Sequence, residues 1–547
     1  MVYISLAPMA LGALVGTAMA STGKRNSTID WFPCSDLDAR YGLVELNITC
    51  AFHEVPLNWA DKSAGQAKLA VAMIPAAKER WGTMFVNPGG PANSGVDFIF
   101  ENGPAVRDEV GGHYDVVSWD VRGGRGHTTP GPPACFNSSE ESAKFFDGTL
   151  EGLGIDIKGN LSDDEQTDEF YSHVDEMDAK YRELGERCAR AQSSLPYVGT
   201  AATARDLISL ADRLDPGVQE INYWGISYGS LLGVTFVNMF PDRVGHVVLD
   251  ACVDPDLWYN KPATDIYAAN LASGDDTLAG FVNECASAGK SGCPLVQNSN
   301  DTGANIRERI QGLLDQAHDL RAAGADLSKT LTSAEFRIQI LSAMFLPLTW
   351  SNFSTMAVAY GQSLEALAAN KSVPGPISQQ LTPLKYNVSA TYEAAAIWCS
   401  DTVDAGNMTM RDGFDAIVDT SANVSAMLGP KWWFTPTLLC FAWPARAVER
   451  YTGPWNNKLK NRILVIGNTA DPGTALKNAE RMAELIGESA VLVKQNGYGH
   501  SSMAEKSTCI VNVIKQYFEN GTLPEDNNTL CEIDDDVVLF PDIANSK

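Results

Sequence analysis

Short runs of consecutive apolar residues alternate with stretches of helical periodicity through much of the chain. Such runs are typical of strands that a sheet buries on both faces. The predicted strands cover residues 83–86, 114–119, 221–224, 244–249, 463–466 and 491–493. Helices are predicted between them, notably over residues 203–214 and near 475–486. Strands that alternate with helices indicate an α/β fold with a mostly parallel sheet.

The pattern changes to helix after helix from about residue 255 to 430. Ile306, Ile310 and Leu314 recur at helical spacing, and Thr332 and Glu335 form a capping box that opens a further helix. We therefore expect a helical cap over residues 255–430. It interrupts an α/β core made of residues 21–254 and 431–547.

The N-terminus has the features of a secretory signal peptide. An apolar run over residues 2–19 ends in Ala18-Met19-Ala20, which predicts cleavage after residue 20. No later stretch is long and apolar enough to span a bilayer, and the C-terminus is polar. We expect a secreted protein without a membrane anchor.

Cysteines support an oxidising compartment. Ten of the eleven fall into sequence-local couples, which we interpret as disulfides. The expected pairs are Cys34–Cys50, Cys135–Cys188, Cys285–Cys293, Cys399–Cys440 and Cys509–Cys531. Cys252 is left over in an apolar stretch, where a buried free thiol is expected.

Charge and sequons narrow the class of partner. The 547-residue chain has a net charge of −26 and carries twelve N-x-[ST] sequons, which favour passage through a glycosylating compartment. A chain this acidic repels phosphate backbones, so we expect no nucleic-acid partner. The simplest reading of the acidity is solubility in an acidic medium.

The motif Gly225-Ile226-Ser227-Tyr228-Gly229 follows a predicted strand and opens a helical stretch. A tight strand-to-helix turn exposes a serine hydroxyl for attack, and its crowding favours glycine at both flanks. This context predicts that Ser227 is a nucleophile on an α/β-hydrolase fold. By itself, the five-residue pattern also fits a simple Gly/Ser turn.

A nucleophilic serine needs a histidine base oriented by a carboxylate, and in this fold the chain order is Ser, acid, His. Asp471 lies in the loop after the strand predicted at 463–466, and His500 in the glycine-containing loop after 491–493. We therefore predict a Ser227–Asp471–His500 triad.

Backbone N–H groups should stabilise the oxyanion that forms during attack. We assign one to Tyr228 and the other to Gly90, in the loop Asn87-Pro88-Gly89-Gly90-Pro91. Gly89 is the alternative donor, and a tight turn without a catalytic role is the simpler reading of this loop.

Together these segments resemble the proline-iminopeptidase-like serine peptidases, in particular their secreted tripeptidyl-aminopeptidase-like branch. The matching segments are Asn87 to Pro91, Asp120-Val121-Arg122-Gly123, Gly225 to Gly229, Phe240-Pro241, Leu249-Asp250, Cys399-Ser400-Asp401, Cys440 to Pro444, Asp471-Pro472-Gly473-Thr474, and Gly499-His500 ahead of Cys509. The resemblance covers roughly residues 45–255 and 395–535, and the cap matches only in character.

Four positions depart from the family pattern. Ala92 replaces a usual glycine, the segment from Asp120 to Gly126 has one extra residue, Ala475 replaces a usual proline, and Cys252 stands where a smaller residue is usual. None of them is a triad residue.

The resemblance implies an acyl-enzyme mechanism that releases short N-terminal pieces from peptides, without metal or cofactor. We expect a monomer, and Asp401 is a weak candidate for binding a substrate ammonium, with a structural role as its alternative. An esterase or amidase acting on a small metabolite would use the same triad. A catalytically silent binding protein on this scaffold is a remote third reading.

Overall fold

The computed structural model describes residues 29–34, 47–158, 161, 164–373, 388–430, 436–526 and 528–542. The predicted signal peptide, residues 1–20, lies outside these ranges. So do Pro374, Pro376 and Pro383, which fall in a part of the cap expected to form loops.

Ten strands of the described residues form one sheet, in the order β1-β2-β3-β5-β4-β6-β7-β8-β9-β10. They are β1 (Phe32–Pro33), β2 (Thr49–Pro56), β3 (Gln66–Ile74), β4 (Gly82–Asn87), β5 (Tyr114–Trp119), β6 (Ile221–Ile226), β7 (Val244–Asp250), β8 (Ile463–Ala470), β9 (Ala490–Tyr498) and β10 (Thr529–Glu532). The β1–β2, β2–β3 and β3–β5 pairs are antiparallel, and all later pairs are parallel. All six predicted strands are confirmed.

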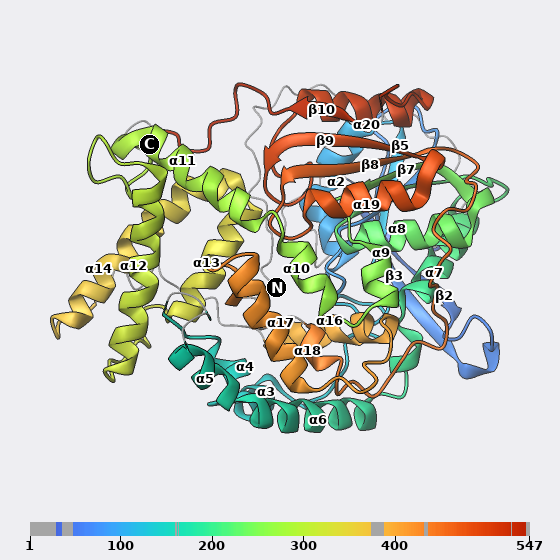
Figure 1. Ribbon diagram of the computed structural model, residues 1–547. Coiled ribbons are helices and arrows are strands. Elements are labelled where there is room, and N and C mark those ends of the chain that lie inside the picture. The colour runs from blue at the N-terminus through green and yellow to red at the C-terminus, as the bar shows by residue number, and fades with distance from the viewer. Residues whose placement is uncertain are drawn as a thin grey trace.

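Helices cover both faces of the sheet (Figure 1). On one face, Leu207 of α7 (Thr200–Leu214), Leu231 of α8 (Tyr228–Met239) and Met482 of α19 (Leu476–Ile486) share a core with Tyr223. On the other, α2 (Gly95–Glu109) and α20 (Thr508–Asn520) pack on the neighbouring side chain, Trp224. Successive side chains of β6 thus enter opposite cores, which explains its unbroken apolar sequence.

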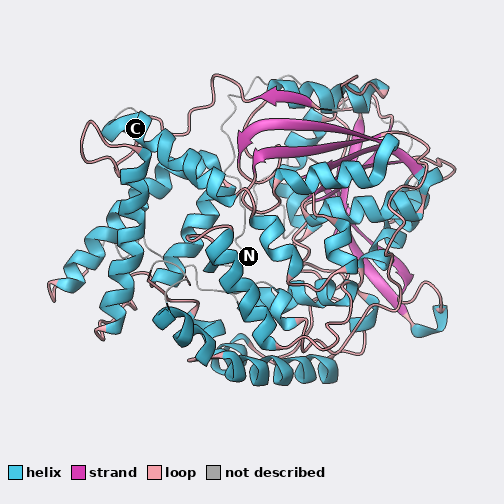
Figure 2. Ribbon diagram, viewed as in Figure 1, coloured by secondary structure: helices cyan, strands magenta, loops and turns pink. Residues whose placement is uncertain are grey.

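The segment between β7 and β8 is helical, as the sequence predicts (Figure 2). Its helices are α9 (Pro255–Asn260), α10 (Asp265–Leu271), α11 (Gly274–Gly292), α12 (Gly303–Ala322), α13 (Ser333–Phe345), α14 (Trp350–Ala368), α16 (Val388–Asp401), α17 (Met410–Asn423) and α18 (Pro436–Leu439). The capping box of Thr332 and Glu335 is present at the start of α13. Helices α11 to α14 bury their own core around Phe281, Phe336 and Trp350.

A second helical segment joins this cap from a part of the chain that the sequence assigned to the core. It comprises α3 (Ser139–Phe146), α4 (Leu150–Leu153), α5 (Asp164–Ser172) and α6 (Val174–Ala191). Phe170 stacks on Phe414 of α17 with ring centroids 4.5 Å apart, and the Tyr171 hydroxyl donates to Asp415. The helical layer is therefore built from two insertions.

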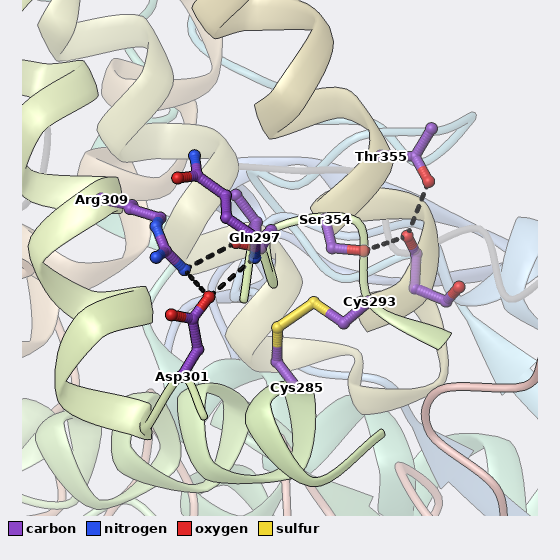
Figure 3. Close-up of a disulfide and its surroundings, with 9 residues drawn as sticks. Cys285, Cys293, Gln297, Asp301, Arg309, Ser354 and Thr355 are labelled. Atoms are coloured by element: carbon purple, nitrogen blue, oxygen red, sulfur yellow. Dashed lines mark hydrogen bonds and ion pairs between the residues drawn. A yellow bond between two sulfur atoms is a disulfide. The ribbon is translucent and has the colours of Figure 1, made fainter. Parts of the chain in front are cut away.

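All five predicted disulfides form, and Cys252 is a buried free thiol. Cys285–Cys293 closes the end of α11, and Figure 3 shows it beside the turn that leads to α12. In that turn Asp301 accepts hydrogen bonds from the Gln297 N–H and the Arg309 guanidinium. Cys399–Cys440 joins α16 to the residues after α18.

In the described part of the chain, no helix combines the length and the apolar composition needed to cross a bilayer.

Candidate active site

Ser227 stands alone between β6 and α8, in a strained backbone conformation. Its φ of 60° and ψ of −124° are unusual for a residue with a side chain. The flanks are closely packed: a Cβ at Gly225 would lie 2.1 Å from the Gly229 carbonyl oxygen, and one at Gly229 would lie 2.3 Å from that of Asn87. The two glycines therefore allow the turn that places Ser227 at the carboxyl edge of the sheet.

The loop after β4 lies directly against this turn. A Cβ at Gly89 would be 2.8 Å from Ser227 Cβ and 2.9 Å from the Tyr228 nitrogen. The Gly89 N–H already donates to Asn87 Oδ1 at 3.0 Å, whereas the Gly90 N–H has no partner among the described residues. Tyr228 is the first residue of α8, so its N–H has no partner within the helix. These contacts favour Gly90 over Gly89 as the second N–H donor, beside Tyr228, to the oxyanion.

Asp471 and His500 are brought together from the ends of β8 and β9. His500 Nδ1 lies 3.0 Å from each carboxylate oxygen of Asp471. Asp471 is fully buried and also accepts hydrogen bonds from the Gly473 and Thr474 N–H groups, both at 2.8 Å. With Nδ1 facing the carboxylate, Nε2 of His500 is left as the basic nitrogen.

The surroundings set the basicity of His500. Burial lowers the pKa of the imidazole, but the charge and hydrogen bond of Asp471, together with the charge of Asp250, outweigh burial and raise the pKa above 6.5. The Thr474 hydroxyl donates to Asp471 Oδ2 at 2.9 Å, which fixes the carboxylate. Thr474 belongs to the Asp-Pro-Gly-Thr motif of the sequence, but the motif alone does not reveal this role.

The cap also holds the histidine. The main-chain N–H of His500 donates to the main-chain carbonyl of Phe345 at 3.1 Å. The imidazole and phenyl rings of the two residues lie 4.9 Å apart between centroids. Phe345 ends α13, some 150 residues before His500, so no sequence pattern joins them. The Asn468 amide donates to the carbonyls of Gly499 and Ser501, which completes the support of this loop.

A small cavity opens beside His500. Its volume is about 120 Å³. Asp97, Phe98 and Glu101 of α2 line one part of it, and Leu346 lines another. Arg125 also lines it, but its guanidinium is paired with Glu393 of α16 at 2.6 Å. The lining therefore contains two carboxylates, those of Asp97 and Glu101, and one guanidinium.

Asp401 is not among the residues that line this cavity, which favours its structural role over substrate binding. It is fully buried, and its carboxylate accepts hydrogen bonds from the Thr200 N–H at 2.9 Å, the Thr200 hydroxyl at 2.5 Å and the Trp258 indole at 3.2 Å. Burial raises the pKa of Asp401 to about 6, although these hydrogen bonds oppose the rise. Because both oxygens are engaged inside the core, Asp401 has a structural role.

Cys252 lies just beyond β7 with its thiol directed at the carbonyl oxygens of Leu249 and Ile466, 3.4 Å and 3.7 Å away. Burial, with the nearby charges of Asp250 and Asp471, raises the pKa of the thiol well above its usual value. Since the reactive species is the thiolate, the thiol is unreactive, as expected.

Comparisons with known proteins also point to hydrolases. A model described as "TAP-like protein" matches residues 425–531, and one described as "alpha/beta hydrolase fold" matches residues 82–288. The chain is 25% identical to a tripeptidyl aminopeptidase of Streptomyces lividans, over 92% of this chain and 87% of that protein. It is 23% identical to serine protease Hip1 of Mycobacterium tuberculosis, over 93% and 92%.

A carboxylesterase B of M. tuberculosis is 27% identical to the chain, over 87% of this chain and 85% of that protein. Among solved structures, an acetylester hydrolase from Corynebacterium glutamicum covers 86% of this chain and 96% of its own, with 14% identity and a TM-score of 0.35. The named relatives thus include both peptidases and an esterase.

Proposed function

We propose that this chain, which has the α/β-hydrolase fold and matches the TAP-like model over residues 425–531, is a secreted serine peptidase that removes short pieces from free peptide N-termini. Ser227 is the nucleophile, His500 the base and Asp471 the acid that orients it. Gly90 and Tyr228 supply the oxyanion donors.

The observation that carries the peptidase assignment is the pair of carboxylates beside His500. Asp97 and Glu101 are four residues apart on α2, so their side chains share one face of the helix, and both line the cavity. A peptide N-terminus is an ammonium ion, and carboxylates are the natural partners of ammonium groups. A neutral ester substrate has no need of them.

The proposed triad and oxyanion donors would carry out the reaction in two stages. His500 Nε2 removes the Ser227 hydroxyl proton as Oγ attacks the scissile carbonyl, and the new oxyanion accepts hydrogen bonds from the Gly90 and Tyr228 N–H groups. Collapse breaks the C–N bond, and the protonated His500 gives its proton to the leaving amine. Water then attacks the acyl-enzyme with His500 again as base, which releases the peptide fragment and restores Ser227.

Two features support secretion. Five disulfides are typical of proteins that fold in oxidising compartments. Eight sequon asparagines fall within the described residues, and all eight are exposed: Asn47, Asn137, Asn300, Asn352, Asn370, Asn407, Asn423 and Asn520.

The test compares peptide amides with free and with blocked N-termini, alongside aryl esters. We expect cleavage of free-amine peptides and its loss in Ser227→Ala. Asp97→Asn and Glu101→Gln should each raise KM for free-amine peptides by about tenfold, the effect of removing one charged hydrogen-bond partner. Asp108→Asn is the matched control, since Asp108 is an exposed acid on the same helix.

Other outcomes would redirect the assignment. Cleavage in Ser227→Ala would overturn the nucleophile. Ester hydrolysis without peptide cleavage would favour the second candidate, an esterase, which the 27% identity to carboxylesterase B supports.

A further inference from the structure

Asp250 touches both halves of the catalytic machinery, although the mechanism above gives it no role. It is the last residue of β7, the strand between β6 and β8. Its main-chain carbonyl accepts the Ser227 N–H at 3.0 Å. Its carboxylate accepts the Ser502 hydroxyl at 2.6 Å and the Ser502 N–H at 3.1 Å. One residue therefore connects the turn of the nucleophile with the loop of the base.

The carboxylate is fully buried, and no Lys or Arg of the described residues pairs with it. The titratable groups that interact electrostatically with it are Asp471 after β8, His500 after β9, Glu109 of α2 and the Cys252 thiol. Three of these are acids, so His500 is the one neighbour that can become positive. A buried carboxylate is costly without a positive partner.

That partner forms during the reaction, because His500 becomes an imidazolium when it takes the Ser227 proton. We propose that Asp250 is a second acid of this active site, an inference that rests on the proposed hydrolase function. It positions the His500 loop through Ser502, and its charge stabilises the imidazolium alongside Asp471. Asp250 is a positioning residue, since Asp471 holds the hydrogen bonds to Nδ1.

Two electrostatic effects agree with this arrangement. Burial raises the pKa of Asp250 to about 6, against the hydrogen bonds of Ser502 and the charge of His500, which lower it. In turn, the charge of Asp250 adds to that of Asp471 in raising the pKa of His500. The two groups therefore respond to each other over the pH range in which the base must be neutral.

The test uses a fluorophosphonate that labels Ser227, so that the readout does not depend on substrate class. Asp250→Asn keeps an acceptor for Ser502 and removes the charge. We expect the acid limb of the labelling rate to move down by about one pH unit, and the plateau rate to fall roughly tenfold. Ser502→Ala keeps the Asp250 carboxyl but weakens the tether, so its plateau should fall while its limb moves less than that of Asp250→Asn.

Asp256→Asn is the matched control, because it removes a carboxylate nearby in sequence that accepts a hydrogen bond from the Asn260 amide. Thermal unfolding checks that each variant is folded. A folded Asp250→Asn with an unmoved limb would overturn the inference and leave the hydrolase assignment intact. Failure to label wild-type Ser227 would overturn both.

A measurement on the wild-type protein covers the case in which Asp250→Asn does not fold. The ring proton of His500, followed by NMR with histidine-selective labelling, should titrate in two steps, because two interacting groups share their titration. A single-step curve would show that Asp250 does not sense the charge of His500, and would overturn the inference.

Discussion

At the scale of single residues, the site depends on side chains whose charge is set by burial. Asp471 and Asp250 are both fully buried near His500, and both raise the pKa of the imidazole. General-base catalysis uses the neutral form. A raised pKa therefore moves the loss of activity to higher pH.

The first prediction concerns this acid limb. For the wild-type protein, kcat/KM should fall as the pH drops through the pKa of His500, with a midpoint above 6.5. Asp471→Asn should lower kcat by about 10⁴-fold, as loss of the orienting acid does in other triads, and move the midpoint down. The measurement is kcat/KM from pH 5 to 9. A rate that stays flat to strongly acidic pH would argue against His500 as the base.

At the scale of elements, disulfides differ in how much chain they constrain. Cys135–Cys188 closes a separation of 53 residues and ties the loop before α3 to the end of α6, whereas Cys285–Cys293 closes only 8. Loop-closure entropy grows with the logarithm of the loop length. The longer bridge should therefore stabilise the fold more.

We predict that the double variant Cys135→Ala/Cys188→Ala loses about 4 kcal/mol of unfolding free energy, against about 2.5 kcal/mol for Cys285→Ala/Cys293→Ala. Urea unfolding of both variants under non-reducing conditions measures the difference. Equal losses, or a larger loss for the short loop, would show that native contacts rather than chain entropy dominate these bridges.

The elements also show what the sequence reveals and what it hides. Strands such as β6 were predictable because a parallel strand buried on both faces is continuously apolar. The α3–α6 segment was missed because α5 and α6 are rich in charged residues and bury few side chains, such as Phe170 and Tyr181. Their apolar stripe makes sense only beside α17, which follows more than 200 residues later.

The same limit applies to the site. Ser227, Asp471 and His500 could be chosen from local motifs in the expected chain order. The contact of Phe345 with His500 and the tether from Asp250 to Ser502 are tertiary, so no local pattern signals them. The sequence left Asp401 open between substrate binding and a structural role, and only its tertiary burial beside Thr200 and Trp258 favours the structural one.

At the scale of the whole molecule, several buried acids make the folded protein less stable at neutral pH than at acidic pH. Burial raises the pKa of Asp250 and Asp401 to about 6 and that of Glu505 to about 7. An acid whose pKa is higher in the folded than in the unfolded state adds stability below its unfolded pKa, near 4, and this is lost as the pH rises through its folded pKa. The raised pKa of His500 acts in the same direction. Stability should therefore fall from about pH 4 to pH 7, while activity rises.

The last prediction follows from this opposition. The Tm of the wild-type protein should be higher at pH 5 than at pH 7.5. Asp401→Asn should reduce that difference, because it removes a titration worth about 1.4 kcal/mol between pH 5 and pH 7.5. Since Asp401 lies in the core, this variant should leave the pH midpoint of kcat/KM in place. Asp419→Asn, an exposed acid on α17, is the control and should change neither quantity. A Tm that rises from pH 5 to 7.5 would contradict this prediction, because it would show that the fold stabilises the ionised forms of these acids. It would also show that the net charge of −26 does not oppose folding at neutral pH.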